Sequence, residues 1–175
     1  MAKRKIVTVP NEVLLQKCKE AKVDDTLREL VKDLIETLEA HTNPKGAGLA
    51  APQVGVLERV CIAKKFLPDP NDPEKELEET FILINPEILT LSEPKSLAWE
   101  GCLSIPDTYG QVERSKRVKV STYDLTGNKF AFKAEGFFAR VIQHEIDHLN
   151  GILFTTKIIG KTLTEKELDE LSKKR

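Results

Sequence analysis

The stretch FFARVIQHEIDHLNGILF, residues 137–154, carries two histidines four positions apart, with a glutamate directly after the first. On a helix, His144 and His148 differ by about 40° around the axis, so their imidazoles share one face and can hold one metal ion. Glu145 lies about 100° from His144, which suits contact with a water on that ion better than ligation of it. This H-E-x-x-H pattern is typical of metal hydrolases, and it predicts a central metal-binding helix rather than two core histidines.

The same helix carries an apolar stripe. Phe137 and Val141 precede His144 by seven and three residues, which places all three on one face. Such a stripe indicates either an apolar wall beside the metal or the ordinary inner face of a core helix. Asn150 and Gly151 are residues that commonly end a helix, so we expect it to stop there.

Two histidines need a third protein ligand if one metal position is to stay open for water. A histidine spaced as in metzincins is excluded, because that position is Phe154. His41 suits a cation at the end of a helix, and Cys61 suits a small buried hydrophobe. Cys102, in the turn-like sequence WEGCLSIP, can supply a thiolate beside the permissive Gly101. Cys18 falls in a segment predicted to be helical.

Composition sets the broad class of protein. The chain has 175 residues, 40% of them hydrophobic and 31% charged, with a net charge of −1. These values predict one globular domain, 1–175, in which 161–175 forms an amphipathic helix or tail with a basic end. We expect no disulfide framework, no membrane partner and no direct nucleic-acid specificity. The lack of a signal-like N-terminus favours a bacterial cytoplasmic location.

Local patterns predict an α+β domain. Apolar residues at helical spacing indicate a long helix over 25–41 with Asp24 or Asp25 as its cap. Gly127 and Asn128 form the expected turn of a hairpin. The proline-rich and acidic segment 67–79 is expected to be a surface loop or excursion that packs no core. The remaining predicted elements are a brief helix over 10–21 and strands over 58–66, 80–89, 116–124 and 129–134.

The stretch GAGLAAPQVG, residues 46–55, matches the glycine spacing of dinucleotide-binding loops. That loop must join a strand to a helix, but a helix end and a turn precede this stretch. Pro52 also falls where the second helical turn would be needed. We therefore set the nucleotide interpretation aside and expect the small residues to leave the backbone accessible to an extended peptide.

The segments GAGLAAPQ, EGCLS and QHEIDH, in this order, resemble the three signature motifs of the peptide deformylases. The resemblance extends from about Val7 to about Thr156. It implies mixed or antiparallel sheets around the H-E-x-x-H helix. It also implies removal of the formyl group from the N-terminal formylmethionine of nascent chains, by attack of metal-bound water on the formyl carbon. The family precedent for the metal is Fe(II) in the cell, which Zn(II), Ni(II) or Co(II) can replace.

The resemblance also implies roles for individual residues. Cys102, His144 and His148 would be the metal ligands, and Glu145 would transfer the proton. The Gln53 side chain and the Leu103 backbone N–H would stabilise the formyl oxygen. Residues expected to contact the substrate are Ala47, Gly48, Gly101, Phe137 and Val141.

Two hypotheses rest on position alone. Glu100 is expected to pair with Arg114 and hold the ligand loop in place, the alternative being two unrelated surface charges. The tail resembles bacterial tails that dock near the ribosomal exit, but it reads equally well as a solvated helix. Two other functional classes remain open, a zinc endopeptidase using the same helix and a noncatalytic module with a closed four-ligand metal site.

Overall fold

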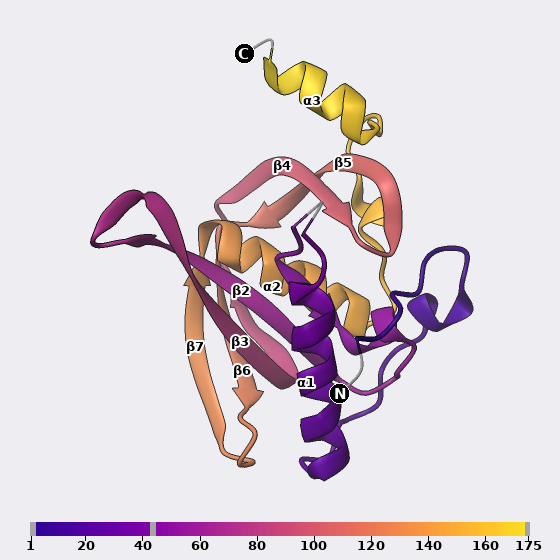
Figure 1. Ribbon diagram of the computed structural model, residues 1–175, viewed down its shortest axis with the longest axis vertical. Helices are drawn as coiled ribbons and strands as arrows, with labels where there is room; N and C mark the ends of the chain where they lie inside the picture. Colours follow the sequence, from indigo (N-terminus) through magenta and orange to yellow (C-terminus); the bar gives the residue numbers. More distant parts are fainter. Residues whose placement is uncertain (1–2, 43–44, 174–175) are drawn as a thin grey trace.

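The computed structural model describes residues 3–42 and 45–173, so residues 174 and 175 of the predicted basic end lie outside the described residues. Figure 1 shows the order of the elements. The α-helices are α1 (Asp25–Glu39), α2 (Gly136–Leu149) and α3 (Glu165–Lys173), and the short 3₁₀ segments are Glu12–Leu15, Ala51–Val54 and Phe154–Lys157. The strands are β1 (Gly48–Ala50), β2 (Val60–Asp69), β3 (Asp72–Leu91), β4 (Lys95–Cys102), β5 (Ile105–Ser115), β6 (Arg117–Tyr123) and β7 (Lys129–Glu135).

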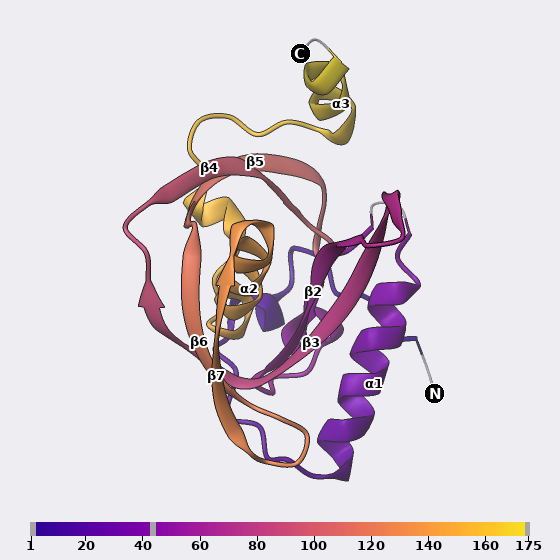
Figure 2. The ribbon, with the colours of Figure 1, turned by 90° about the vertical axis from the view of Figure 1, so that its left-hand side faces the viewer.

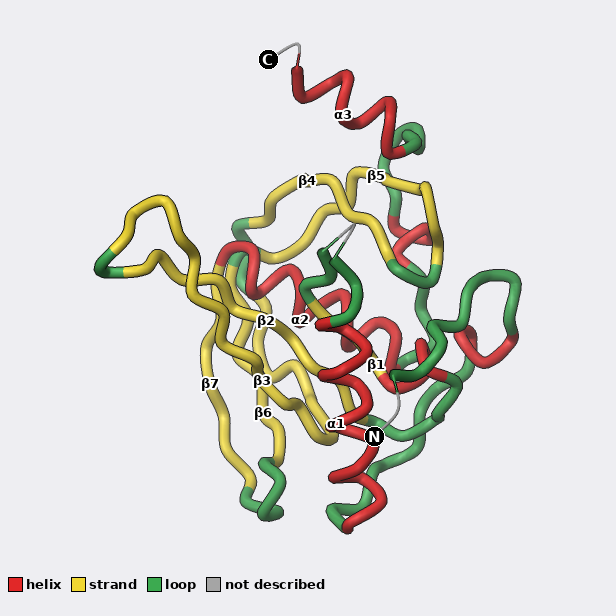
Figure 3. The backbone as a smooth tube through the Cα atoms, viewed as in Figure 1, coloured by secondary structure: helices red, strands yellow, loops and turns green. Residues whose placement is uncertain are grey.

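The strands form two antiparallel sheets around one helix. The larger sheet has the order β1-β2-β3-β6-β7, and β4 pairs with β5 in the smaller one. Figure 2 shows α2 between β6 and β7 on one side and β2 and β3 on the other. The tube in Figure 3 shows the smaller sheet lying across the end of this arrangement. The predicted α+β class with antiparallel sheets around α2 is confirmed.

The central position of α2 follows from its sequence. It buries apolar side chains such as Ile142, Ile146 and Leu149 against the inner face of the larger sheet. The long helix α1 covers the opposite face, where Leu30 and Leu34 pack with Ile62 of β2. Side chains alternate between the two faces of a strand, so β2 takes part in both cores. Packing against the larger sheet therefore fixes the position of α2, the helix that carries the H-E-x-x-H pattern.

Several local predictions are confirmed. The side chain of Asp24 accepts a hydrogen bond from the Leu27 N–H at 3.0 Å and caps α1. Strands β6 and β7 form the predicted hairpin, in which Gly127 has a φ of +87°. Helix α2 ends before Gly151, whose φ is +72°. In each case a short polar or glycine residue supplies a geometry that other side chains disfavour.

The predicted helix over 10–21 is wrong. Only Glu12–Leu15 is helical, as a single 3₁₀ segment, and Cys18 follows outside any helix. The Cys18 N–H bonds to the Leu149 carbonyl, and the Lys19 N–H bonds to the Leu57 carbonyl. Tertiary hydrogen bonds with distant segments outweigh a helical propensity that is weak over so few residues.

The expectation for 67–79 is wrong about the loop, because this segment forms a long hairpin arm, but it is a surface excursion as expected. Leu67 pairs with Leu77 and Phe66 with Glu78, and the turn lies at Pro70 and Asn71. The hairpin needs only main-chain pairing and does not have to bury a core. Alternating acidic side chains therefore fit its exposed surface, and a prediction based on hydrophobicity misses it.

The smaller sheet was not anticipated. Its strands β4 and β5 pair along their whole length, from Lys95 opposite Ser115 to Cys102 opposite Ile105. The chain after α2 continues this sheet, with bridges from Val112 to Ile158 and from Tyr109 to Leu163. Residues 161–164 of the tail lead into the predicted short helix, α3. No helix in the described parts of the chain is long and apolar enough to cross a membrane.

Candidate metal centre

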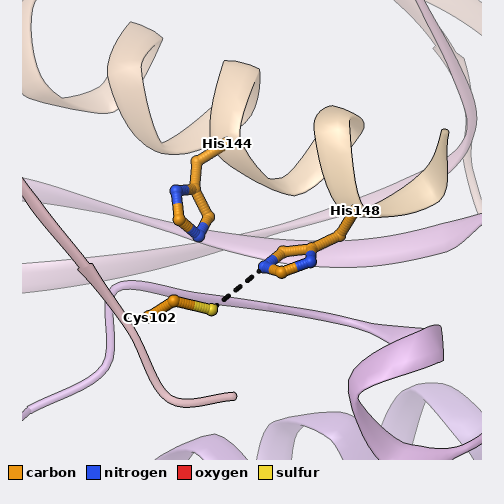
Figure 4. Close-up of side chains that lie close together, drawn as sticks. All are labelled: Cys102, His144 and His148. Carbon is orange, nitrogen blue, oxygen red and sulfur yellow. Dashed lines mark hydrogen bonds between the residues drawn. The ribbon is translucent and has the colours of Figure 1, made fainter. Parts of the chain in front are cut away.

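Cys102, His144 and His148 converge from two elements, as Figure 4 shows. The two histidines project from successive turns of α2, and Cys102 lies at the end of β4. The Cys102 Sγ atom lies 3.2 Å from His148 Nε2. One ligand atom from each residue lies within 4.8 Å of the others. The structure therefore brings the three predicted ligands together, although Cys102 precedes the histidines by more than forty positions in sequence.

The donor set suits a divalent transition metal. A thiolate and two imidazoles bind Zn(II), Fe(II), Co(II) or Ni(II) and do not suit Mg²⁺ or Ca²⁺. Among the described residues, no fourth histidine, cysteine or acid joins this group. Three protein ligands leave a position for a reacting molecule, as in catalytic sites, whereas structural sites have four. This finding does not favour the closed four-ligand module, and His41 lies apart from the ligands at the cleft wall.

The other two thiols occupy a different environment. Burial raises the pKa of Cys18 to about 11 and the pKa of Cys61 well above its ordinary value. Both thiols therefore remain protonated near neutral pH, and they lie in the apolar core. Cys102 is partly exposed at the cleft. This contrast agrees with the predicted choice of Cys102 among the three cysteines.

Glu100 orients one of the histidines. Its Oε2 atom lies 3.1 Å from His144 Nδ1, which leaves the other ring nitrogen directed toward the ligand group. The Arg114 guanidinium donates two hydrogen bonds to Glu100, at 3.0 and 2.9 Å. Both side chains are buried, so the predicted pair exists and is not a pair of unrelated surface charges. Such partners set the ring orientation and basicity of a metal ligand.

The pair belongs to a larger buried network that the sequence did not reveal. Arg140 donates to Glu100 at 2.6 Å, and Arg114 also bonds to Asp147. Lys157 contacts both carboxylate oxygens of Asp147 at 2.7 Å. Their positions on α2 gave a signal, because Arg140 and Asp147 are charged residues of a buried helix that do not belong to the H-E-x-x-H pattern. Buried charges of this kind normally have partners.

The network keeps Glu100 ionised. Burial alone raises the pKa of Glu100, but hydrogen bonds from His144 and Arg114 outweigh it and hold that pKa well below its usual range. Burial has the opposite effect on Arg114, whose pKa it lowers. The contact with Glu100 outweighs this effect, so the pKa of Arg114 is raised. The carboxylate is therefore available to accept the His144 Nδ1 proton throughout the physiological pH range.

The Gln53 amide is fixed in the wall beside Cys102. Its Oε1 accepts the Ala50 N–H at 2.8 Å, so its Nε2 must point the other way. That nitrogen lies 3.3 Å from Ser104 Oγ and 3.5 Å from Cys102 Sγ. The side chain is buried, with 2% exposure. The Ala50 backbone therefore determines the direction of the amide donor.

Glu145 is buried at the cleft with an unused oxygen. Among the described side chains, its Oε2 atom is one of three buried polar atoms without a hydrogen-bond partner. Burial raises the pKa of Glu145 to about 7. A carboxyl that titrates near neutral pH is suited to taking and returning a proton. An unpartnered oxygen at a cleft is expected where a reacting molecule supplies the missing contact.

A cleft of about 510 Å³ joins these residues. Its lining includes ten of the eleven predicted site residues, namely Ala47, Gly48, Gln53, Gly101, Cys102, Leu103, Phe137, Val141, His144 and Glu145. His148 lies behind this wall and is 1% exposed. Val141 is buried, whereas Phe137 is 57% exposed at the rim. The volume falls in the range of small-molecule and peptide-end pockets.

Gly48 leaves room for Glu145. A Cβ atom at this position would lie only 2.8 Å from Glu145 Cδ, so the carboxylate would have to move. We therefore expect Gly48→Ala to lower kcat by about tenfold or more, because misplacement of a reacting group by about 1 Å can cost 100-fold. Metal content and the thermal unfolding temperature should change little. Full activity of the variant would show that the position of Glu145 is not critical.

Comparisons with known proteins agree with this arrangement. The family model for polypeptide deformylase matches residues 3–163. The chain is 46% identical over 174 residues to a peptide deformylase of Thermomicrobium roseum, covering 97% of this chain and 94% of that protein. It is 41% identical over 172 residues to peptide deformylase 1 of Bacillus subtilis, covering 98% and 99%. The Met-Ala-Ser-bound crystal structure of a class I type b peptide deformylase from Acinetobacter baumannii is similar, with a TM-score of 0.78 and 36% identity over 90% of this chain and 99% of that one.

Proposed function

Since this chain belongs to the polypeptide deformylase family, it is a metal-dependent hydrolase that removes the N-terminal formyl group of nascent polypeptides, and we propose which residues perform the reaction. The observation that supports the assignment is the convergence of Cys102, His144 and His148 beside the unpartnered carboxylate of Glu145. We assign the first three residues as metal ligands and Glu145 as the general acid and base.

The metal is proposed to be Fe(II) in the cell, with Zn(II), Ni(II) or Co(II) able to replace it, because the ligand set accommodates all four. When bound, such an ion supplies a Lewis acid that polarises the formyl carbonyl and makes a water molecule more acidic. The chain supplies the other requirements of the reaction, which are proton transfer, stabilisation of the oxyanion and orientation of the substrate.

Glu145 takes a proton from the attacking water and returns it to the leaving amine. The water oxygen forms a bond to the formyl carbon, the bond from that carbon to the amine nitrogen breaks, and formate and a free N-terminus are released. Gln53 Nε2 and the Leu103 N–H donate hydrogen bonds to the formyl oxygen as its negative charge develops. Because Ala50 and Ser104 hold Gln53, its donor needs little reorganisation during the reaction.

The substrate is proposed to lie in the cleft with its formylmethionine end at the metal ligands. Phe137 and Val141 form one apolar wall, and Gly101 of β4 also lines the cleft. Ala47 and Gly48 supply the edge along which the peptide backbone runs, because β1 pairs with β2 on one side only. The backbone of Ala47 and Gly48, which carries only small side chains, therefore serves as a strand edge for the peptide.

A Gln53→Ala variant tests the oxyanion donor. We expect kcat to fall by about 100-fold to 1,000-fold, the usual effect of removing one such donor. Metal content should remain at one ion per chain, because the amide is not among the proposed ligands. A Gln53→Glu variant keeps the size of the side chain but removes its donor, so it should be similarly impaired. A loss of metal that parallels the loss of activity would instead give Gln53 a structural role.

The proposed reaction is tested by formate release from formyl-Met-Ala-Ser under anaerobic conditions with the Fe(II)-loaded protein. Unblocked Met-Ala-Ser should remain intact in the same assay. Cleavage of an internal peptide bond would support the endopeptidase instead, and metal binding without either reaction would support a noncatalytic module.

The tail is proposed to dock the enzyme near the ribosomal exit, and residues 1–175 are proposed to act as a single catalytic domain in a bacterial cytoplasm. Main-chain bonds between Tyr109 and Leu163 join the tail to β5, and α3 beyond it has no buried residue among those described. Deletion of residues 165–175 should therefore reduce co-sedimentation with ribosomes and leave turnover of a free formyl peptide nearly unchanged. Undiminished co-sedimentation would count against docking by the tail.

A further inference from the structure

The base of the hairpin arm formed by β2 and β3 lies at the outer end of the cleft, beside the first turn of α2 (Figure 1). Phe66 of β2 and Glu78 of β3 are directly opposite each other in this arm, so their side chains share one face. The Phe66 ring lies 6.0 Å from the ring of Phe137. The Lys45 ammonium lies 5.6 Å from the centre of the Phe66 ring and forms an ion pair with Glu78. Because Lys45 and Phe137 both line the cleft, Phe66 joins two of its rim residues.

Two walls of the cleft lead from the proposed reacting group to this arm. At the inner end, a Cβ atom on Gly48 would lie only 2.8 Å from Glu145 Cδ, so these residues are in contact. At the outer end, Lys45 and Phe137 both meet Phe66. One wall runs back along the chain from Gly48 to Lys45, and the other runs back along α2 from Glu145 to Phe137. A peptide held between these walls is therefore directed outward to Phe66.

The side chains of α2 are spaced to meet alternate residues of an extended peptide. Val141 precedes His144 by three residues, or about 4.5 Å along the helix axis, and Phe137 precedes it by seven, or about 10 Å. In an extended peptide the first and third side chains lie on the same side and are about 7 Å apart. A formylmethionine side chain beside Val141 therefore places the third side chain beside Phe137.

The outer end of these walls suits an apolar side chain. Phe137 is 57% exposed, although it stands at the rim of a cleft where a ligand can cover it. The nearby cation of Lys45 is already paired with Glu78, which also accepts a hydrogen bond from Lys64 at 2.7 Å. A carboxylate on the substrate would have to compete with Glu78 for Lys45. An apolar side chain would instead remove the exposed surface of Phe137 from water.

We propose that Phe66 and Phe137 form a subsite for an apolar side chain, above all an aromatic ring, at the third residue of the formylated peptide. This inference rests on the proposed function and extends it to Phe66, which no sequence pattern indicated. Aromatic pairs gain binding free energy beyond the area that they bury, so a third ring is favoured over an aliphatic side chain. The enzyme would then process fastest those nascent chains whose third residue is aromatic.

Deformylation of amidated tripeptides by the Fe(II)-loaded protein under anaerobic conditions tests the subsite. The amide removes the terminal charge, so the peptides differ in one side chain only. We expect kcat/KM for formyl-Met-Ala-Phe-amide to exceed that for formyl-Met-Ala-Ser-amide by about fivefold to tenfold. The gain should be in KM, because the contact is the same in the ground state and the transition state. In formyl-Met-Phe-Ala-amide the ring points to the other side, so most of the gain should be lost.

Equal kcat/KM values for the phenylalanine and serine peptides would overturn the proposal, as would an equal gain from phenylalanine at the second position. Faster turnover of formyl-Met-Ala-Lys-amide than of the phenylalanine peptide would also overturn it. That result would assign the third side chain to Asp107 and Glu165, two acids that line the cleft as well. Formate release from every peptide without preference refutes this inference alone, whereas no formate release from any of them refutes the proposed function.

Variants of Phe66 show whether the arm supplies the preference. In Phe66→Ala the ratio of the two kcat/KM values should fall to about twofold, because only Phe137 remains to contact the substrate ring. Phe66→Tyr keeps the ring and should restore the original ratio. The matched control is Phe130→Ala, which removes a ring that is 40% exposed on β7 and does not line the cleft, so it should keep that ratio. An unchanged ratio in Phe66→Ala, or an equal fall in Phe130→Ala, would exclude the arm from the subsite.

Discussion

Replacement of Glu145 by glutamine should abolish most deformylation while the protein keeps its metal. Glutamine has nearly the same size, so the fit against Gly48 and the core should persist, but it cannot accept a proton from water. General acid–base groups contribute about 100-fold to 10,000-fold to enzymatic rates, and we expect kcat to fall within or beyond this range. The measurement is formate release in single-turnover and steady-state assays, with metal content determined on the same samples.

The matched control is Glu170→Gln, which removes an exposed carboxylate in α3 and should leave kcat unchanged. The charge change is the same, so a general electrostatic effect is excluded. Thermal unfolding should show little destabilisation of the Glu145→Gln protein, and it can become slightly more stable, since a buried group without a partner is costly. A variant that retains metal and more than about a tenth of the activity would exclude Glu145 as the proton-transfer group.

Replacement of Arg114 by alanine should cause the largest loss of stability. It removes the guanidinium shared by Glu100 and Asp147 and leaves two carboxylates less well compensated in the interior. Breaking a buried ion pair by deleting one partner costs about 3 to 5 kcal/mol. Arg140 and Lys157 remain as partners, so the lower part of this range is expected. Urea unfolding at neutral pH measures the effect.

The same variant should bind metal less tightly. Glu100 holds His144 by its Nδ1 atom, and loss of such supporting groups weakens metal affinity by about 10-fold to 100-fold. Competition with a chelator gives this value separately from stability. The control is Arg28→Ala, which removes a largely exposed pair with Asp25 and should cost about 1 kcal/mol or less. Full metal affinity in the Arg114→Ala protein would show that Glu100 does not need Arg114 to position His144.

The sequence predicted those elements whose signals are local. Helix α1 has an apolar stripe and an aspartate cap, and the β6–β7 hairpin has alternating strands around Gly127. The β2–β3 arm gave no such signal, because its exposed strands are stabilised by main-chain pairing and carry many charged residues. The β4–β5 sheet gave none either, because the buried positions of β5 include the polar Arg114 and Ser115 beside Val112. Hydrophobic periodicity reports burial, and it says little about a strand that is exposed on both faces.

The sequence indicated more of the residues of the candidate site than of the strands around it. A fixed spacing on one helix indicated His144, Glu145 and His148, and comparison of the three cysteine contexts favoured Cys102. Arg140 and Asp147 were missed, since their role depends on which distant charges the fold brings to them. The orientation of Gln53 likewise depends on a backbone N–H of Ala50, which no pattern of side chains records.

The attachment of segment 157–163 to β5 and α2 affects the order in which parts of the enzyme can fold during its synthesis. Ile158 and Leu163 complete the outer sheet, and Lys157 completes the charge network through Asp147. A polypeptide is synthesised from its N-terminus, so these residues emerge after every proposed ligand and after the proposed proton-transfer group. The outer wall of the cleft therefore gains this support only after the proposed catalytic residues have been synthesised. An enzyme that processes unfinished chains thus has a cleft that is itself incomplete when its own ligand residues have just emerged.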